Sequence, residues 1–205
     1  MKKNSFIYKL LSLVISFFYL ANCNSQNLDI DLLKSINPRN PNSIVMRGLT
    51  SSAYPLGAAV PFAQLVAGYI TKDKNLQYKG WETVGSLAVT VVVGEGLKYA
   101  INRQRPYTTY PGVVFPYDAS ETGQSFPSGH TSIAFATATS LALEYKKWYV
   151  VVPAYLWAAG VGYSRLYLGE HYPTDVLAGA VVGAGSAWLS HWLTKKVFKT
   201  RNNAN

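Results

Sequence analysis

The sequence predicts an all-α fold: a bundle of five main helices, expected to be transmembrane, that follows an N-terminal signal or anchor segment. Of the 205 residues, 49% are hydrophobic and only 14% are charged, whereas ordinary soluble domains are about 25% charged. Apolar segments of helical length recur along the chain, and strand signals are nearly absent. Cys23 is the only cysteine, so no internal disulfide can stabilise the bundle.

The N-terminus has the pattern of an export signal. Three lysines precede an apolar run over residues 10–20, which small and polar residues follow. We therefore expect residues 1–23 to form a signal peptide or a retained N-terminal anchor. The residues before Cys23 also resemble a bacterial lipoprotein cleavage box, which leaves lipidation as an alternative. Residues 24–47 are polar and carry turn signals, which predict an exported lead-in with a short helix.

Five apolar segments are predicted to be helices. Residues 48–70 contain no charged side chain and are long enough to cross a bilayer despite two internal prolines. The last helix is expected to begin near Pro173, because proline suits the first turn of a helix, and to end before a polar tail at 199–205. The intervening helices are expected at residues 84–101, 130–144 and 148–163.

The charge distribution favours a membrane partner. The formal net charge is +9, yet no basic tract interleaved with aromatic residues predicts binding to nucleic acid. If residues 48–70 cross inward, the loops 71–81 and 144–147 and the C-terminal tail share one side, which holds more Lys and Arg than the other. This distribution fits the positive-inside rule. The alternative is a soluble bundle, because several of the apolar segments are short.

Two basic residues lie near the junction between the second predicted helix and the loop that follows it. On a helix, Lys98 and Arg105 would project from one face, and Pro106 would end the regular structure. Two cations on one face can clamp an oxyanion. Alternatively, Lys98 is a snorkelling lysine and Arg105 a charge at a helix C-terminus. Glu95 could pair with Lys98 or, equally, be a simple charge on the helix face. The rest of the loop, to residue 126, predicts a lid or rim.

A second polar cluster directly precedes the third predicted helix. Ser128 offers a hydroxyl group, Gly129 frees backbone N–H groups, and a helix N-terminus attracts anions. Together these groups suit a phosphate, and His130 adds a proton donor. His191, by contrast, lies between two tryptophans of the last helix, which predicts a core or interfacial residue.

A third cluster lies in residues 164–175. A carboxylate at Asp175 can reach the imidazole of His171 across one helical turn, hold it in one tautomer and leave its other nitrogen free as a nucleophile or ligand. Arg165 adds a fixed positive charge. Taken alone, the three residues also fit a helix cap with a surface ion pair. Glu170 is expected to be an exposed rim residue or, alternatively, to tune the tolerance for substrate charge.

The three clusters together resemble the signature of the type 2 phosphatidic acid phosphatase (PAP2) superfamily, which also includes bacterial acid phosphatases and vanadium-dependent haloperoxidases. Every motif position is matched. The resemblance covers residues 98–175 by motif and 48–193 by helix pattern, and it implies a helical phosphatase domain over residues 48–198. The matching motifs are Lys98-x6-Arg105-Pro106, Pro127-Ser128-Gly129-His130 and Ser164-Arg165-x5-His171-x3-Asp175.

The resemblance implies a phosphatase that needs no metal or other cofactor. By analogy with the family, His171 attacks phosphorus and forms a phosphohistidine, while Asp175 orients its imidazole. His130 would protonate the leaving group and later activate water. Fixed cations and N–H donors suit this chemistry, because phosphoryl transfer spreads negative charge over the equatorial oxygens. The implied phosphate-binding residues are Lys98, Arg105, Ser128, Gly129 and Arg165.

The expected function is hydrolysis of a phosphorylated lipid headgroup at a bacterial inner membrane, by a site that faces the periplasm. Undecaprenyl diphosphate, phosphatidylglycerol phosphate, phosphatidic acid and a lipid A phosphate are all compatible with the sequence. The alternatives are a periplasmic acid phosphatase, soluble or lipid-anchored, that acts on small phosphomonoesters, a vanadate-dependent oxidase of halides, and a noncatalytic lipid-binding bundle. No sequence feature indicates an oligomeric state.

Overall fold

A computed structural model of the protein describes residues 25–121 and 123–202. Within these ranges the fold is helical and contains no strand, only an isolated bridge between Pro111 and Val114, which confirms the predicted all-α class. The predicted signal or anchor segment, with Cys23, lies outside the described residues. The long helices of the bundle are α3 (Ile44–Ile70), α4 (Lys74–Ile101), α6 (Gly129–Tyr145), α7 (Trp148–Tyr167) and α8 (Pro173–Asn202).

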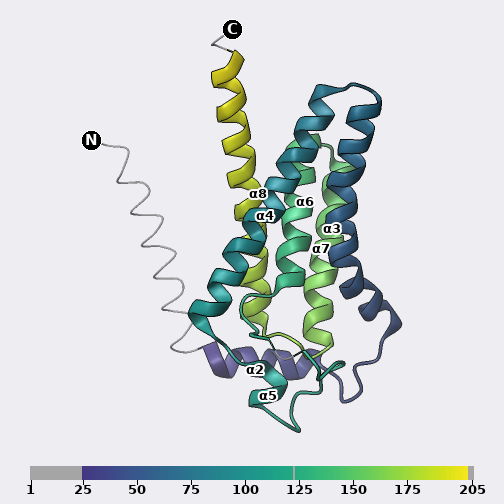
Figure 1. The fold of residues 1–205 in the computed structure, drawn as a ribbon. Coiled ribbons are helices and arrows are strands. Elements are labelled where there is room, and N and C mark those ends of the chain that lie inside the picture. The colour runs from purple at the N-terminus through teal and green to yellow at the C-terminus, as the bar shows by residue number, and fades with distance from the viewer. Residues whose placement is uncertain (1–24, 122, 203–205) are drawn as a thin grey trace, which may run out of the picture.

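Two shorter helices lie at one end of the bundle (Figure 1). Helix α2 (Ser25–Ile36) is the helix expected in the lead-in, and it crosses the end of the bundle beside α5 (Pro106–Thr109). The long helices begin and end within a few residues of the predicted bounds, with exceptions in α4 and α8. Because α8 continues to Asn202, the predicted polar tail is helical over its first residues.

Helix α6 occupies the centre of the bundle and packs against α3, α4, α7 and α8. Its middle turns are buried and consist largely of small residues. The contact with α8 is close, since a Cβ atom at Gly183 would clash with the backbone oxygen of Ser132, and one at Gly179 would lie 2.7 Å from that of Ser128. Such glycine contacts are typical of helices that pack within membranes.

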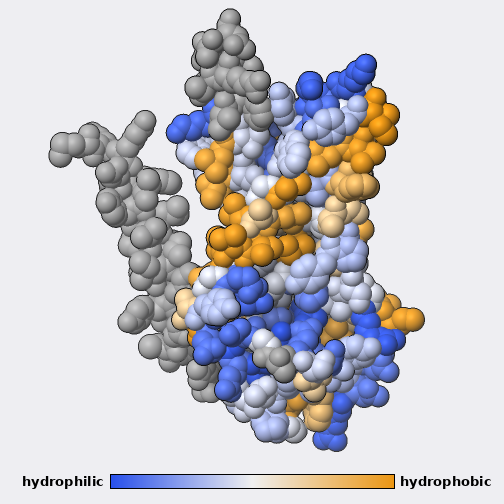
Figure 2. Space-filling view, in the orientation of Figure 1, coloured by the Kyte–Doolittle hydropathy of each residue, from blue (hydrophilic) through white to orange (hydrophobic). Residues whose placement is uncertain are grey.

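Among the described residues, three helical segments are long and apolar enough to cross a membrane, namely Ile44–Ile70, Lys74–Thr109 and Pro173–Lys196. Hydrophobic side chains gather along the long helices, whereas the end of the molecule near α2 and α5 is mainly hydrophilic (Figure 2). The apolar residues on the outer faces are exposed, as expected if lipid covers them. We therefore treat the chain as a membrane protein. The exposed residues include Phe62, Ile70, Val92, Leu156 and Trp188.

Helix α4 begins earlier than predicted because Asp73 caps it. The Asp73 carboxylate accepts hydrogen bonds from the backbone N–H groups of Asn75 and Leu76, at 2.9 and 3.2 Å. These bonds satisfy amide groups that the first turn leaves unpaired, so the polar residues from Lys74 onward become helical.

The end of α4 corrects one prediction. Asn102 adopts a left-handed conformation with φ of 48° and donates its N–H to the Lys98 carbonyl oxygen, so the helix stops at Ile101. Arg105 lies beyond this stop, where it is the N-cap of α5. The prediction that Lys98 and Arg105 project from one helix face is therefore wrong, since Asn102 turns the chain away before Arg105.

Candidate active site

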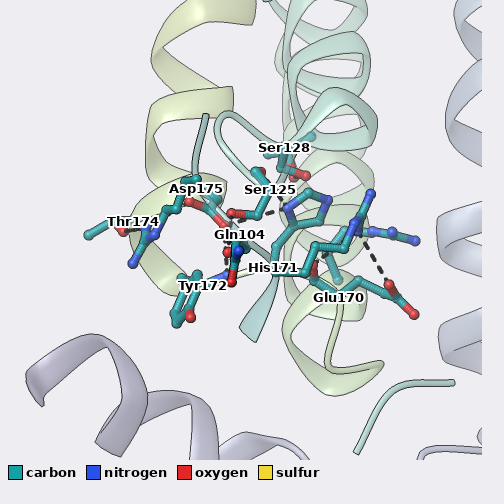
Figure 3. A network of polar contacts seen from close by, with 12 residues as sticks. Gln104, Ser125, Ser128, Glu170, His171, Tyr172, Thr174 and Asp175 are labelled. Atoms are coloured by element: carbon teal, nitrogen blue, oxygen red, sulfur yellow. Dashed lines mark hydrogen bonds and ion pairs between the residues drawn. The ribbon is translucent and has the colours of Figure 1, made fainter. Parts of the chain in front are cut away.

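The predicted motif residues meet at the hydrophilic end of the bundle, where α6 and α8 begin and α7 ends. His171 is almost completely buried there, and its ring points toward Ser125 (Figure 3). Nδ1 lies 2.7 Å from the Ser125 backbone oxygen and 3.6 Å from Oδ2 of Asp175. A carbonyl oxygen only accepts hydrogen bonds, so Nδ1 carries the hydrogen and Nε2 keeps its lone pair.

Asp175 lies in the first turn of α8 and is fully buried. Its Oδ2 accepts a hydrogen bond from the backbone N–H of Tyr172 at 2.9 Å, and its Oδ1 lies 2.8 Å from Nη1 of Arg103. Because α8 begins at Pro173, His171 lies just before the helix. The predicted proximity of carboxylate and imidazole is confirmed, although a carbonyl oxygen is nearer to Nδ1.

The surroundings of His171 keep its imidazole neutral. Burial lowers the pKa of His171 to about 4, although the Asp175 carboxylate acts in the opposite direction. An imidazole with this pKa is deprotonated at neutral pH, and its Nε2 lone pair is available for attack.

Arg105 and Arg165 converge on a single carboxylate. Nη2 of Arg105 lies 2.7 Å from Oε2 of Glu121, and Nη2 of Arg165 lies 3.1 Å from both carboxylate oxygens. Burial alone would raise the pKa of Glu121, but Arg165 and Arg105 outweigh it and lower this pKa. The two guanidinium groups therefore form an anion site that a carboxylate occupies.

Both arginines also donate hydrogen bonds to groups other than Glu121. Arg105 donates from Nε to the Gly123 carbonyl oxygen at 3.0 Å, and Arg165 donates from Nη1 to Oγ1 of Thr50 on α3 at 2.8 Å. The Nε–H group of Arg165 is buried and has no hydrogen-bond partner among the residues that the structure describes. Arg165 thus retains an unused donor inside the site.

His130 lies in the first turn of α6. Its ring packs edge-on against Tyr54, with centroids 4.6 Å apart, and the Tyr54 hydroxyl oxygen lies 3.1 Å from where a Cβ of Gly129 would be. Burial and the charge of Arg165 lower the pKa of His130 to about 3. His130 is therefore neutral in the absence of a bound anion.

Ser128 connects the second motif to the third. Its backbone N–H donates to the Asp175 carbonyl oxygen at 3.0 Å, and its buried hydroxyl oxygen accepts a hydrogen bond from Thr131 at 2.9 Å. The first turn of α6 is thereby fastened to the first turn of α8. This contact keeps Gly129 and His130 near His171.

Lys98 does not join the pair of arginines. Its Nζ lies 3.2 Å from Oε1 of Glu95, so of the two alternatives for Glu95 the ion pair is confirmed. Both residues line a groove between α3, α4 and α6, together with Tyr54, Pro127 and Gly129. Lys98 therefore lies in this groove, which the first turn of α6 also lines.

Glu170 is buried, so the prediction of an exposed rim residue is wrong. Gly169, with φ of +72°, turns the chain after α7 and directs Glu170 inward. The Glu170 carboxylate lies 3.3 Å from Nη1 of Arg105 and accepts a hydrogen bond from the Asp118 backbone N–H at 3.2 Å. Burial raises the pKa of Glu170 to about 7, and the alternative interpretation as a charge-tuning residue stays a prediction.

Several residues of the site lie outside the three motifs. Arg103 has a weak signal, because it belongs to the same basic run as Arg105. Glu121 lies in the loop that was predicted to be a lid or rim, and its contacts confirm that this loop borders the site. Ser125 contributes a backbone carbonyl oxygen, which no side-chain pattern reveals. Elsewhere, His191 lies 2.5 Å from a Glu82 carboxylate oxygen rather than in apolar surroundings.

Comparisons with known proteins identify a family and several relatives. A family model described as the PAP2 superfamily matches residues 79–199. The chain is 30% identical over 187 residues to an undecaprenyl-diphosphatase of Sulfolobus acidocaldarius, which covers 90% of this chain and 88% of the relative.

Two solved structures share the fold over most of their length. A transmembrane PAP2-type phosphatidylglycerolphosphate phosphatase from Bacillus subtilis has a TM-score of 0.68 and 25% identity, with 93% of this chain and 98% of that chain covered. LpxE from Aquifex aeolicus has a TM-score of 0.64 and 29% identity, with 80% and 94% covered.

Proposed function

Because the chain belongs to the PAP2 superfamily, we propose that it hydrolyses a phosphorylated lipid headgroup, without a metal ion, through a phosphohistidine at His171. Its relatives are named phosphatases, and the chain is itself a hydrolase of phosphoric esters or anhydrides. The lipid class of the substrate, the covalent intermediate and the roles of individual residues belong to the proposal.

One observation carries the proposal. Arg105 and Arg165 hold the Glu121 carboxylate between them, and Arg105 also contacts Glu170, the residue before His171. A phosphoryl group that displaces the carboxylate would meet two fixed guanidinium groups and the unused Nε–H of Arg165. These donors suit the charge that develops on the equatorial oxygens during phosphoryl transfer.

The first chemical step forms a bond from Nε2 of His171 to phosphorus and breaks the bond from phosphorus to the leaving oxygen. His171 can attack because its imidazole is neutral, and Asp175 stabilises the positive charge that the ring acquires. His130 gives its proton to the leaving oxygen. In the complex, the negative phosphate raises the pKa of His130, because it opposes the charge of Arg165.

In the second step, His130 takes a proton from water, whose oxygen attacks phosphorus. The nitrogen–phosphorus bond breaks, and inorganic phosphate leaves with both histidines restored. Ser128, Gly129 and Lys98 complete the proposed phosphate site from the first turn of α6 and from the groove. Glu95 pairs with the ammonium group of Lys98 in this groove.

Two features support a lipid substrate. The groove beside the site lies between α3, α4 and α6 and includes the apolar residues Val91 and Ile133. Two of these helices belong to the segments that can span a membrane, so an acyl or prenyl chain can lie among them while its phosphate reaches His130. The positive-inside distribution supports a site that faces the periplasm from a bacterial inner membrane.

The proposal is tested with the detergent-purified protein and a panel of phosphates. The panel contains undecaprenyl diphosphate, phosphatidylglycerol phosphate, phosphatidic acid, a lipid A phosphate and p-nitrophenyl phosphate. We expect at least one lipid to be hydrolysed with a higher kcat/KM than the soluble ester, and the rate to persist in chelator. A preference for the soluble ester, or loss of activity in chelator, would contradict the proposal.

The covalent step is tested with a substrate that carries a radiolabelled phosphate, and the reaction is quenched in alkaline denaturant. We expect an acid-labile, base-stable label in the wild type and none in His171→Ala, which should also lose activity. His191→Ala is the matched control, since His191 lies on α8 beside Glu82 and away from the site. Wild-type turnover by His171→Ala would sink the mechanism.

A further inference from the structure

Asp175 lies beside an arginine that is outside the three motifs. The Asp175 carboxylate is fully buried and Nη1 of Arg103 lies 2.8 Å from its Oδ1. A buried carboxylate is costly unless a positive group pairs with it. His171 is neutral and lies farther away, at 3.6 Å, so Arg103 supplies the compensating charge.

Arg103 is itself held on several sides. Its guanidinium carbon lies 3.7 Å from the centroid of the Tyr172 ring, and Nη1 also donates to Oγ1 of Thr174 at 2.7 Å. Nη2 lies 2.8 Å from Oδ2 of Asp29 on α2. The planar guanidinium group therefore bridges two buried carboxylates, a geometry that the ammonium group of lysine cannot reproduce.

Asp29 fastens the lead-in helix to the site. Its side chain is buried, its Oδ1 accepts the backbone N–H of Thr174 at 3.0 Å, and its Oδ2 accepts both the Thr174 hydroxyl and Arg103. Thr174 belongs to the first turn of α8, directly before Asp175. Helix α2 therefore contacts the turn that presents Asp175, although it precedes the residues that the family model matches.

We propose that Arg103 and Asp29 are positioning residues of the phosphatase, and that helix α2 is thereby part of its catalytic site. Arg103 holds Asp175 against His171 and sets how much of its negative charge the imidazole experiences. Asp29 holds Arg103 and shares its positive charge. This inference rests on the proposed role of His171.

The two residues should act in opposite directions on the protonation of His171. This ring faces Asp175 on α8, Arg165 on α7, His130 on α6, and Arg105 and Glu170 nearby. Removal of the Arg103 charge leaves Asp175 more negative in effect, which raises the pKa of His171. Without the Asp29 charge, the positive charge of Arg103 acts on Asp175 alone and offsets more of its negative charge. This change lowers the pKa of His171.

The test compares Arg103→Gln, Arg103→Lys and Asp29→Asn in the full-length protein, with undecaprenyl diphosphate and p-nitrophenyl phosphate as the two substrates. We expect kcat to fall on the order of 10-fold or more in Arg103→Gln, as with other residues that orient a reacting group. KM should stay within about twofold, because the guanidinium group of Arg103 is engaged by Asp175, Asp29 and Thr174. Arg103→Lys should recover part of kcat. The acid limb of the pH–rate profile should move to higher pH in Arg103→Gln and to lower pH in Asp29→Asn.

Matched controls separate positioning from general loss of charge. Asp31→Asn removes an exposed carboxylate of α2 that pairs with Lys34, and Arg39→Gln removes an exposed arginine. Both should keep the wild-type kcat and pH profile. Thermal unfolding in detergent identifies a variant that does not fold, and the Arg103→Lys and Asp29→Asn variants then still decide the question.

The experiments distinguish a failure of the inference about Arg103 and Asp29 from a failure of the proposed phosphatase function. If His171→Ala is inactive but Arg103→Gln and Asp29→Asn keep the wild-type kcat and pH profile, only the inference about these two residues fails. It also fails if KM alone changes, or if Asp31→Asn is as harmful as Asp29→Asn. If His171→Ala keeps its activity, the proposed function itself is wrong.

Discussion

Nδ1 of His171 lies 2.7 Å from the backbone carbonyl oxygen of Ser125, nearer than the 3.6 Å that separates it from the Asp175 carboxylate. The backbone therefore sets the tautomer of the proposed nucleophile, and the carboxylate acts mainly through its charge. This division of roles leads to the first prediction.

Asp175→Asn should lower kcat less than His171→Ala does. The substitution removes the charge that stabilises the imidazolium-like ring, but the Ser125 carbonyl oxygen keeps the hydrogen on Nδ1. We expect a loss of about 10²-fold, the size of one electrostatic contribution to a transition state. Steady-state kinetics of purified variants measures it. A loss as complete as that of His171→Ala would show that the Ser125 contact does not suffice to hold the tautomer.

Glu121→Gln should lower KM. The Glu121 carboxylate occupies the anion position between Arg105 and Arg165, so the substrate phosphate has to displace it. Since a partly exposed ion pair contributes about 1 kcal/mol, KM should fall roughly fivefold. Asp118→Asn, an exposed change in the same loop, is the control. A higher KM in Glu121→Gln would instead indicate that Glu121 assists substrate binding.

Phosphate affinity should fall as pH rises through about 7. The raised pKa of Glu170, about 7, means that this residue is protonated below that pH and negative above it. The negative form competes with phosphate for Arg105 and faces Arg165 and Glu121 as well. KM should therefore rise above pH 7 in the wild type, and this rise should be absent from Glu170→Gln. An identical pH dependence of KM in both proteins would refute the role of Glu170.

His130→Asn should accumulate the phosphohistidine when the leaving group is good. Attack on p-nitrophenyl phosphate needs little help from a general acid, whereas hydrolysis of the intermediate still needs the base that activates water. Rapid quenching should show a burst of p-nitrophenol followed by slow turnover. If the phosphate of the substrate is radiolabelled, the label should remain on His171. Slow p-nitrophenol release without any burst would place His130 in the first step alone.

The local amino-acid sequence determines the helices of this protein and the chemical groups of its site. Apolar segments of helical length and Pro173 predict the five long helices, because such segments form helices to satisfy their backbone groups and bury their apolar faces. Likewise, the three motifs predict the phosphate chemistry, since Arg165, His171 and Asp175 carry a cation, a nucleophile and a carboxylate at short spacing. These features depend on residues near one another in the chain.

Only the tertiary structure decides how the site is assembled. Asn102 ends α4 and so separates Arg105 from Lys98, and the turn at Gly169 buries Glu170. The contact of His171 with Ser125 uses a backbone carbonyl oxygen, which every residue possesses, and therefore leaves no trace in the sequence. The bridge from Asp29 through Arg103 to Asp175 joins segments far apart in the chain, which become neighbours only when α2 packs against the first turn of α8.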